Sequence, residues 1–259
     1  MLVNIIYGII VLIATTIGSI AGIGGGVIIK PAFDTLGIHN PTTISFYSSI
    51  AVFTMALISI LKLLKTGVVL KKEIILPISF GSIIGGILGE RLFNYILKNL
   101  KNINDIKVIQ SSLLLFSLFL ILFYTLNKHK IKTFNLKNKF WIFFIGMCLG
   151  CISIFLGIGG GPLNIALMTI FFSYEAKEAA VYSIATIFFS QCSKLIDISL
   201  KGNFLEFDLL PLPFICIFAI IGGFIGTNLN RKFDSKKIEK IYIITIFCLS
   251  SLCVVNILS

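Results

Sequence analysis

The chain has 259 residues, of which 57% are hydrophobic and only 13% are charged, and its mean hydropathy is +1.02. A soluble domain carries about 25% charged residues, so this composition excludes an ordinary soluble protein. The formal net charge is +11, but the basic residues fall in short polar segments, where they normally report membrane orientation. Binding to nucleic acid is therefore not expected.

Apolar runs long enough to cross a bilayer follow one another along the whole chain. About 20 apolar residues span the hydrocarbon core, and somewhat shorter runs do so when polar side chains at their ends reach the interface. The runs are 2–22, 43–61, 74–89, 106–126, 140–158, 179–193, 209–229 and 238–258. The sequence therefore predicts an all-α integral membrane protein that crosses the membrane several times.

The pentapeptide Gly-Ile-Gly-Gly-Gly occurs at Gly22–Gly26 and again at Gly157–Gly161, 135 residues later. Further matches at this offset, or two residues beyond it, are Tyr47-Ser48 with Tyr182-Ser183, and GGILG at Gly85–Gly89 with GGFIG at Gly222–Gly226. Matches that recur in the same order indicate an internal duplication. The two pseudo-symmetric halves are residues 1–126 and 140–259, joined by a basic linker over 127–139.

The basic residues favour one arrangement of the two halves. Internal repeats in membrane proteins are typical of transporters and are either parallel or inverted. If each pentapeptide is the tip of a hairpin, each half crosses the membrane an odd number of times, and most of the 22 basic residues gather on the linker side. An even number of crossings leaves no charge bias, which is unusual. We therefore predict inverted repeats, with the linker in the cytoplasm and both termini outside.

Several glycines in succession favour a break in a membrane helix, because each interior glycine costs about 1 kcal/mol relative to alanine. Lipid cannot satisfy the backbone groups that a break frees, so they must face protein, water or a ligand. Pro162 follows the second pentapeptide directly, and proline is favoured at the first position of a helix. We expect short helices over residues 26–36 and 162–172, with N-termini inside the membrane that suit an anion. Close helix packing or a turn is the structural alternative.

The candidate substrate-binding groups are the backbone N–H donors of the two breaks and the polar side chains near them. The donors are expected at Gly24, Gly25, Gly26, Gly159, Gly160 and Gly161. Weaker candidates are the side chains of Asn164, Ser48 and Ser183. No metal ligand set and no catalytic residue is expected among them.

A polar stripe with helical spacing runs along the later apolar segment. Its members are Ser183, Thr186, Ser190 and Lys194, and Gln191 adjoins them. Such a stripe either lines a path or joins helices through hydrogen bonds. Lys194 can hold an anion, but pairing with Asp197 or snorkelling to the interface is favoured this close to the end of the segment. Carboxylates within the apolar runs are few, which argues against a proton relay through side chains.

Cys148 and Cys151 form a CxxC pattern, which occurs in redox pairs and in halves of metal sites. No second CxxC and no nearby histidine completes a metal site. Small thiols that pack like alanine or serine are the favoured interpretation. We therefore expect no cofactor, no metal and no enzyme activity.

The paired GIGGG breaks, the GGILG and GGFIG counterparts and the two-half organisation resemble the TauE/SafE family of membrane permeases over nearly the whole chain. The resemblance implies a multi-pass permease of the bacterial inner membrane. It also implies transport of a small anion, a sulfur-containing oxyanion or an organosulfonate such as sulfite or sulfoacetate. Val27 stands where the second motif has Pro162, so we expect a pocket that is only pseudo-symmetric.

Two other interpretations stay open. One is a passive anion channel of the same construction that lacks an alternating-access step. The other is a membrane-embedded, thiol-dependent sulfur-handling protein that uses Cys148 and Cys151. The expected partners are a small anionic substrate and the lipid bilayer. The sequence leaves the direction of transport, the coupling ion and the oligomeric state, including a homodimer, open.

Overall fold

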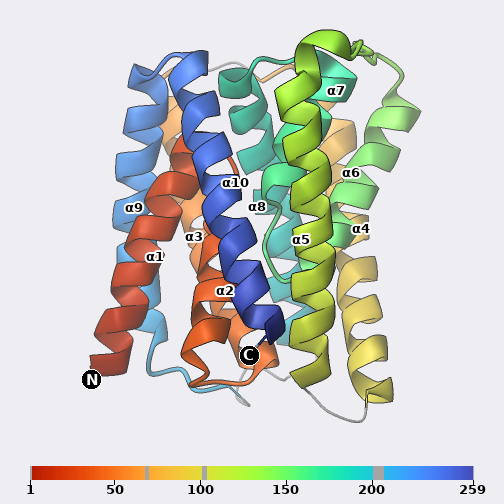
Figure 1. Cartoon of the computed structure of the whole chain (residues 1–259). Coiled ribbons are helices and arrows are strands. Elements are labelled where there is room, and N and C mark those ends of the chain that lie inside the picture. Colours follow the sequence, from red (N-terminus) through yellow and green to blue (C-terminus); the bar gives the residue numbers. More distant parts are fainter. Residues whose placement is uncertain (1, 68–69, 101–103, 201–206, 259) are drawn as a thin grey trace.

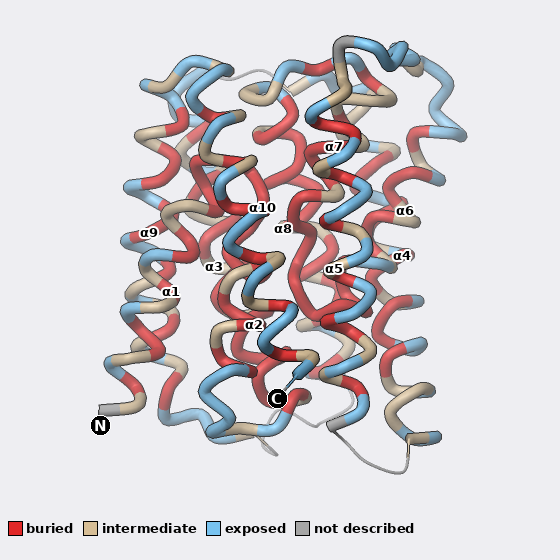
Figure 2. The backbone as a smooth tube through the Cα atoms, viewed as in Figure 1, coloured by how far each residue is buried: buried red, intermediate tan, exposed pale blue. Residues whose placement is uncertain are grey.

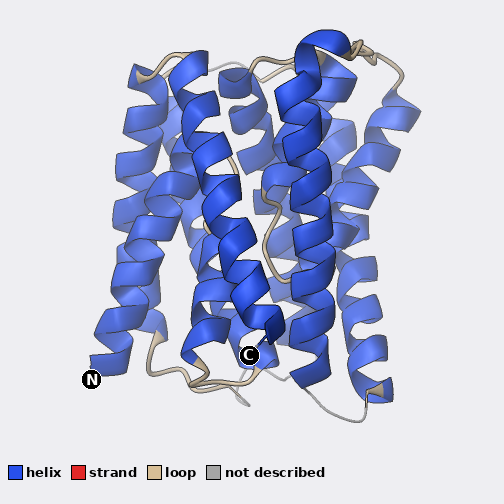
Figure 3. Cartoon of the chain, in the orientation of Figure 1, coloured by secondary structure: helices blue, strands red, loops and turns tan. Residues whose placement is uncertain are grey.

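The computed structural model describes residues 2–67, 70–100, 104–200 and 207–258, and within these ranges the chain is a bundle of helices without a strand (Figures 1 and 3). The first half contains α1 (Leu2–Ala21), α2 (Gly26–Leu36), α3 (Pro41–Lys65), α4 (Lys72–Asn99) and α5 (Asn104–Asn127). After a short 3-10 turn, η1 (Lys128–Lys130), the second half contains α6 (Lys139–Phe155), α7 (Pro162–Phe172), α8 (Ala176–Leu200), α9 (Leu212–Lys232) and α10 (Ser235–Leu258). The all-α prediction is confirmed.

Each half has the same order of helices. A first helix ends at the pentapeptide, a short helix follows it, and three long helices complete the half. The short helices, α2 and α7, cover the residue ranges expected from the sequence. Among the described residues, seven helices are long and apolar enough to cross a membrane, while α2, α6 and α7 are shorter. The chain is a multi-pass membrane protein.

The two short helices lie toward opposite ends of the bundle. Both chain termini lie at one end, here called the terminal end, and the segment after α5 lies at the other, the linker end (Figure 1). From the break that follows α1, α2 turns back toward the terminal end, whereas α7 rises from its break toward the linker end (Figure 1). The predicted inverted repeat requires the two short helices to run in such opposite directions.

Glycines allow the two halves to interleave. α1 of the first half packs most extensively on α9 of the second, and α6 of the second packs on α4 of the first. A Cβ atom built on Gly85 of α4 would overlap the carbonyl oxygen of Met147 on α6, and one on Gly226 of α9 would overlap that of Thr16 on α1. Small residues let membrane helices approach this closely. The GGILG and GGFIG motifs are therefore contacts between the halves.

The long helices α3 and α8 form the centre of the bundle. Within their apolar windows 61% and 67% of the residues are buried, against 33% in α5, α9 and α10. The outer helices are buried on one side and exposed on the other (Figure 2). On α5 the exposed side carries Phe116, Phe119 and Phe123, which suits a surface that faces lipid.

Candidate functional site

The two pentapeptide breaks lie against each other. A Cβ atom built on Gly24 would lie 3.5 Å from the carbonyl oxygen of Gly159, and one on Gly161 would lie 3.0 Å from Cγ2 of Val27. A Cβ on Gly26 would overlap the carbonyl oxygen of Ile158. This close approach needs residues without a side chain. The structure thus brings together Gly24 and Gly26 of the first break and Gly159 and Gly161 of the second.

The breaks share part of their backbone conformation. The φ angle is 74° at Gly22 and 67° at Gly157, and it is 69° at Gly24 and 70° at Gly159. These are left-handed values that residues with a Cβ rarely adopt. The third glycines differ, because Gly25 is helical, with a φ of −65°, whereas Gly160 has a φ of 123°. The conformational symmetry therefore stops before the short helices begin.

Gly25 and Gly160 also face different neighbours. A Cβ on Gly25 would lie 2.9 Å from Cγ2 of Thr15, so this position packs against α1 and closes the first hairpin. A Cβ on Gly160 would lie 2.8 Å from Cδ1 of Ile187 on α8 and 2.9 Å from Nδ2 of Asn164. Of the six candidate glycines, Gly25 is thus a contact within its own hairpin.

Both short helices begin at the breaks, so their N-terminal N–H groups point into the protein core. The first N–H groups of a helix have no partner within that helix. In the described part of the chain, the backbone N–H groups of Gly160 and Gly161 donate no hydrogen bond to a backbone acceptor. The positive ends of two helix dipoles meet around these donors.

Polar atoms of three buried side chains, two of them beside the second break, have no hydrogen-bond partner in the described part of the chain. Within the described ranges, both amide atoms of Asn164, Oε1 of Gln191 and Oγ of Ser48 have none, and each of these residues is only 1% exposed. Nδ2 of Asn164 adjoins Gly160, and Nε2 of Gln191 lies 3.0 Å from the Cβ position of Gly159. An unsatisfied buried polar group costs about 1–3 kcal/mol. A ligand with acceptor atoms at the second break would satisfy the amide NH₂ group of Asn164.

The hydroxyl groups of the polar stripe on α8 donate hydrogen bonds to backbone carbonyl oxygens of the protein. Ser183 Oγ donates a hydrogen bond of 2.6 Å to the carbonyl oxygen of Gly22. Thr186 and Ser190 donate to carbonyl oxygens of their own helix. Gln191, which adjoins the stripe in sequence, faces the break with its Nε2 atom, and its Oε1 atom has no hydrogen-bond partner among the described residues. Sequence reasoning placed Gln191 beside the stripe but did not include it in the candidate site.

Two buried lysines flank the start of the second break. Lys30 Nζ lies 2.7 Å from Oδ2 of Asp34, and the Lys30 Cε atom lies 2.9 Å from the Cβ position of Gly157. Lys194 Nζ donates to Ser45 Oγ at 2.7 Å and lies 3.7 Å from Oε2 of Glu90.

The position of Lys194 corrects the expectation that it pairs with Asp197 or snorkels to the interface. The Lys194 side chain is only 3% exposed and lies against Glu90 and Ser45. Helix spacing on α8 suggested Asp197, but neighbouring helices surround α8. The carboxylate that meets Lys194 therefore comes from α4, which no local pattern in the sequence reveals.

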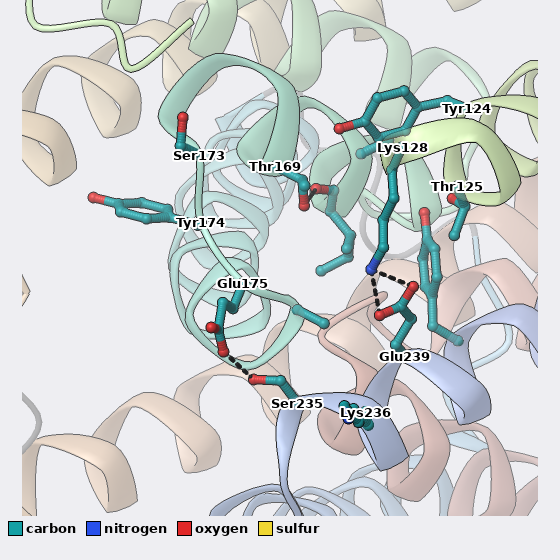
Figure 4. A pocket seen from close by; sticks show the side chains of 14 residues that line it. Tyr124, Thr125, Lys128, Thr169, Ser173, Tyr174, Glu175, Ser235, Lys236 and Glu239 are labelled. Atoms are coloured by element: carbon teal, nitrogen blue, oxygen red, sulfur yellow. Dashed lines mark hydrogen bonds and ion pairs between the residues drawn. The ribbon is translucent and has the colours of Figure 1, made fainter. Parts of the chain in front are cut away.

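A cavity of about 530 Å³ opens at the linker end between α5, α7 and α10 (Figure 4). The ion pair of Lys128 with Glu239 lies on its wall, together with Glu175, which accepts a hydrogen bond of 2.7 Å from Ser235. Tyr242 also lines the cavity and donates a hydrogen bond of 2.8 Å to the carbonyl oxygen of Pro162. The cavity therefore reaches from the linker end to the first turn of α7.

The two cysteines of the CxxC pattern lie on α6 and are free thiols. The backbone of Cys151 packs against Gly85 and Gly89 of α4, so this part of α6 is a helix contact. Across the described residues, no group of three or more His, Cys, Asp or Glu side chains is placed to hold a metal ion.

Comparison with known proteins gives a match over nearly the whole chain. The model of the family described as Sulfite exporter TauE/SafE matches residues 7–252. A protein of Bacillus subtilis (strain 168), named Probable membrane transporter protein YunE, is 29% identical, and the alignment covers 89% of each chain. No solved structure matches the chain.

Proposed function

The chain belongs to the sulfite exporter TauE/SafE family, and we propose that it carries a small sulfur-containing anion, an oxyanion or an organosulfonate, across the bacterial inner membrane by alternating access. One observation carries the proposal. The two glycine breaks meet in the protein, and the unpartnered amide of Asn164 and the amide NH₂ group of Gln191 lie beside the second break.

The groups at the breaks match the chemistry of such an anion. A sulfite or sulfonate group offers several oxygen acceptors and a negative charge. The N–H groups at the start of α2 and α7 and the amide NH₂ groups of Asn164 and Gln191 are donors, and both helix dipoles favour negative charge there. The glycines leave room for the oxygens to approach the backbone. Ser48, with its unpartnered hydroxyl, is a further candidate ligand.

Alternating access needs two halves that move against each other around the site. We take the halves to be inverted repeats, with the linker end in the cytoplasm. The cavity of about 530 Å³ then gives access from the cytoplasmic side. Toward the terminal end, Asn256 of α10 donates a hydrogen bond of 3.0 Å to the carbonyl oxygen of Pro31 on α2. Rocking of the halves would break this contact and close the cavity.

Flux into proteoliposomes tests the proposal. Purified protein is reconstituted, and the uptake of labelled sulfite, thiosulfate, sulfoacetate and taurine is measured against concentration. A carrier saturates and exchanges labelled for unlabelled substrate across the membrane. Flux that rises without saturation would show a channel, and no flux above protein-free vesicles for any of these compounds would refute the proposal.

A further inference from the structure

Lys194 lies on the same face of α8 as Gln191, because residues three apart are neighbours on a helix. The Gln191 amide adjoins Gly159, and the Lys194 ammonium donates to Ser45, whose Oγ lies 2.9 Å from the Cβ position of Gly157. Successive turns of α8 therefore present an amide and a cation to the same break.

The ion pair of Lys194 with Glu90 is loose for a buried pair. Its N–O distance is 3.7 Å, against 2.7 Å for Lys30 and Asp34. Hydrogen bonds to oxygen require about 3.2 Å or less, and Oε2 of Glu90 has no hydrogen-bond partner in the described part of the chain. A cavity of about 50 Å³, lined by Ser45, Glu90 and Lys194 among others, adjoins the pair. It has room for about one or two water molecules.

The same place in the other half of the molecule is uncharged. The residue 135 positions before Lys194 is Ser59, and the residue 137 positions after Glu90 is Thr227. Thr227 Oγ1 donates a hydrogen bond of 2.9 Å to Ser59 Oγ. A pair of hydroxyls thus suffices to hold this helix contact. Burying two charges in the equivalent contact carries a desolvation cost, which indicates a use beyond packing.

From this geometry we infer that Lys194 is an anion-binding residue of the transport site and that Glu90 is its internal competitor. The inference rests on the proposed function and adds a cation to its site. In the empty site, Glu90 neutralises the ammonium group of Lys194. A bound anion takes its place beside that ammonium, and the carboxylate of Glu90 then acts as a like charge that keeps the anion from being held too tightly for release.

Sulfite binding to the purified full-length protein tests the assignment. The dissociation constant is measured by calorimetry, at one pH and ionic strength, for the wild type, Lys194→Gln, Glu90→Gln and the matched control Ser59→Ala. Lys194→Gln should weaken binding about tenfold or more, and Glu90→Gln should tighten it several-fold. Ser59→Ala, which changes the uncharged contact of the other half, should bind like the wild type.

A repeat-matched double variant, Lys194→Ser with Glu90→Thr, covers the case in which one single variant fails to fold. It recreates the hydroxyl pair that holds Ser59 and Thr227 together, so it should fold and still lose sulfite affinity. If Lys194→Gln or the folded double variant binds sulfite like the wild type, the pair is structural and the inference is overturned, while the proposed function stands. Absence of anion binding by the wild type would overturn both.

Discussion

The hydroxyl of Ser183 on α8 donates a hydrogen bond of 2.6 Å to the carbonyl oxygen of Gly22, directly after the end of α1. The two residues belong to different halves of the chain, so the second half supplies a hydrogen-bond donor to the first break. Ser48 is the counterpart of Ser183 in the repeat and is equally buried, yet its hydroxyl has no partner among the described residues. The two serines therefore differ in what they contribute to stability.

We expect Ser183→Ala to lower the free energy of unfolding by about 1–3 kcal/mol, because it leaves the buried carbonyl of Gly22 without a donor. Ser48→Ala removes a hydroxyl that bonds to nothing described and should unfold like the wild type. Denaturant unfolding in detergent micelles measures both. Equal losses in the two variants would contradict the assigned roles.

Gly22 and Gly37 distinguish two reasons for a glycine, a left-handed backbone conformation and the lack of space for a Cβ atom. Both have a left-handed φ, 74° and 64°, but a Cβ on Gly37 meets nothing within 4 Å, whereas one on Gly22 overlaps the backbone of Ala180. Gly37→Ala should cost only the left-handed conformation, about 1–2 kcal/mol. Gly22→Ala should cost clearly more, since α8 must move away. Thermal unfolding of the two variants gives the comparison, and a smaller loss for Gly22→Ala would show that the break does not contact α8.

Replacement of both Cys148 and Cys151 by alanine should leave anion flux unchanged. Both lie on α6, where the backbone of Cys151 packs against α4, and alanine preserves a small side chain at each position. The measurement is sulfite uptake into proteoliposomes by the double variant and by the wild type. Loss of flux in the double variant would favour the thiol-dependent alternative.

Reporter fusions test the predicted orientation. The basic residues of the linker and of the helix ends near it, such as Lys62 and Lys65 of α3 and Arg231 and Lys232 of α9, should face the cytoplasm. A reporter active only outside the cytoplasm should therefore work when fused to the C-terminus, and one active only inside should not. The reverse pattern would place the linker outside and invert the assignment of the cavity.

Local signals in the sequence predicted the helical membrane fold and the two short helices. The hydropathy of the chain indicates which segments cross the membrane. The glycine runs, the second of which is followed by Pro162, indicate where a helix ends and the next begins. Both features can be predicted without knowledge of contacts between distant segments. The expectation that both GIGGG breaks belong to one pseudo-symmetric pocket depended on the second copy of the motif.

Contacts between segments that are distant in the chain could not be predicted from the sequence. Gln191 was not singled out, since its importance comes from its position beside Gly159 and not from its own helix. The expected pairing of Lys194 with Asp197 rested on helical spacing, whereas the carboxylate that faces Lys194 is Glu90, 104 positions earlier. In a bundle whose halves interleave, the neighbours of a buried charge depend on packing between helices.

Transport by the double variant Asn164→Ile, Gln191→Ala tests the central claim most directly. The counterparts of these residues in the first half are Ile29 and Ala56, so the repeat already accommodates these side chains. Because the variant removes buried polar atoms that have no partner, and the first half holds these side chains at the equivalent positions, it should still fold. The account predicts that the folded variant inserts normally and carries no sulfite above the level of empty vesicles. Uptake at the wild-type rate would show that the paired breaks do not hold the anion.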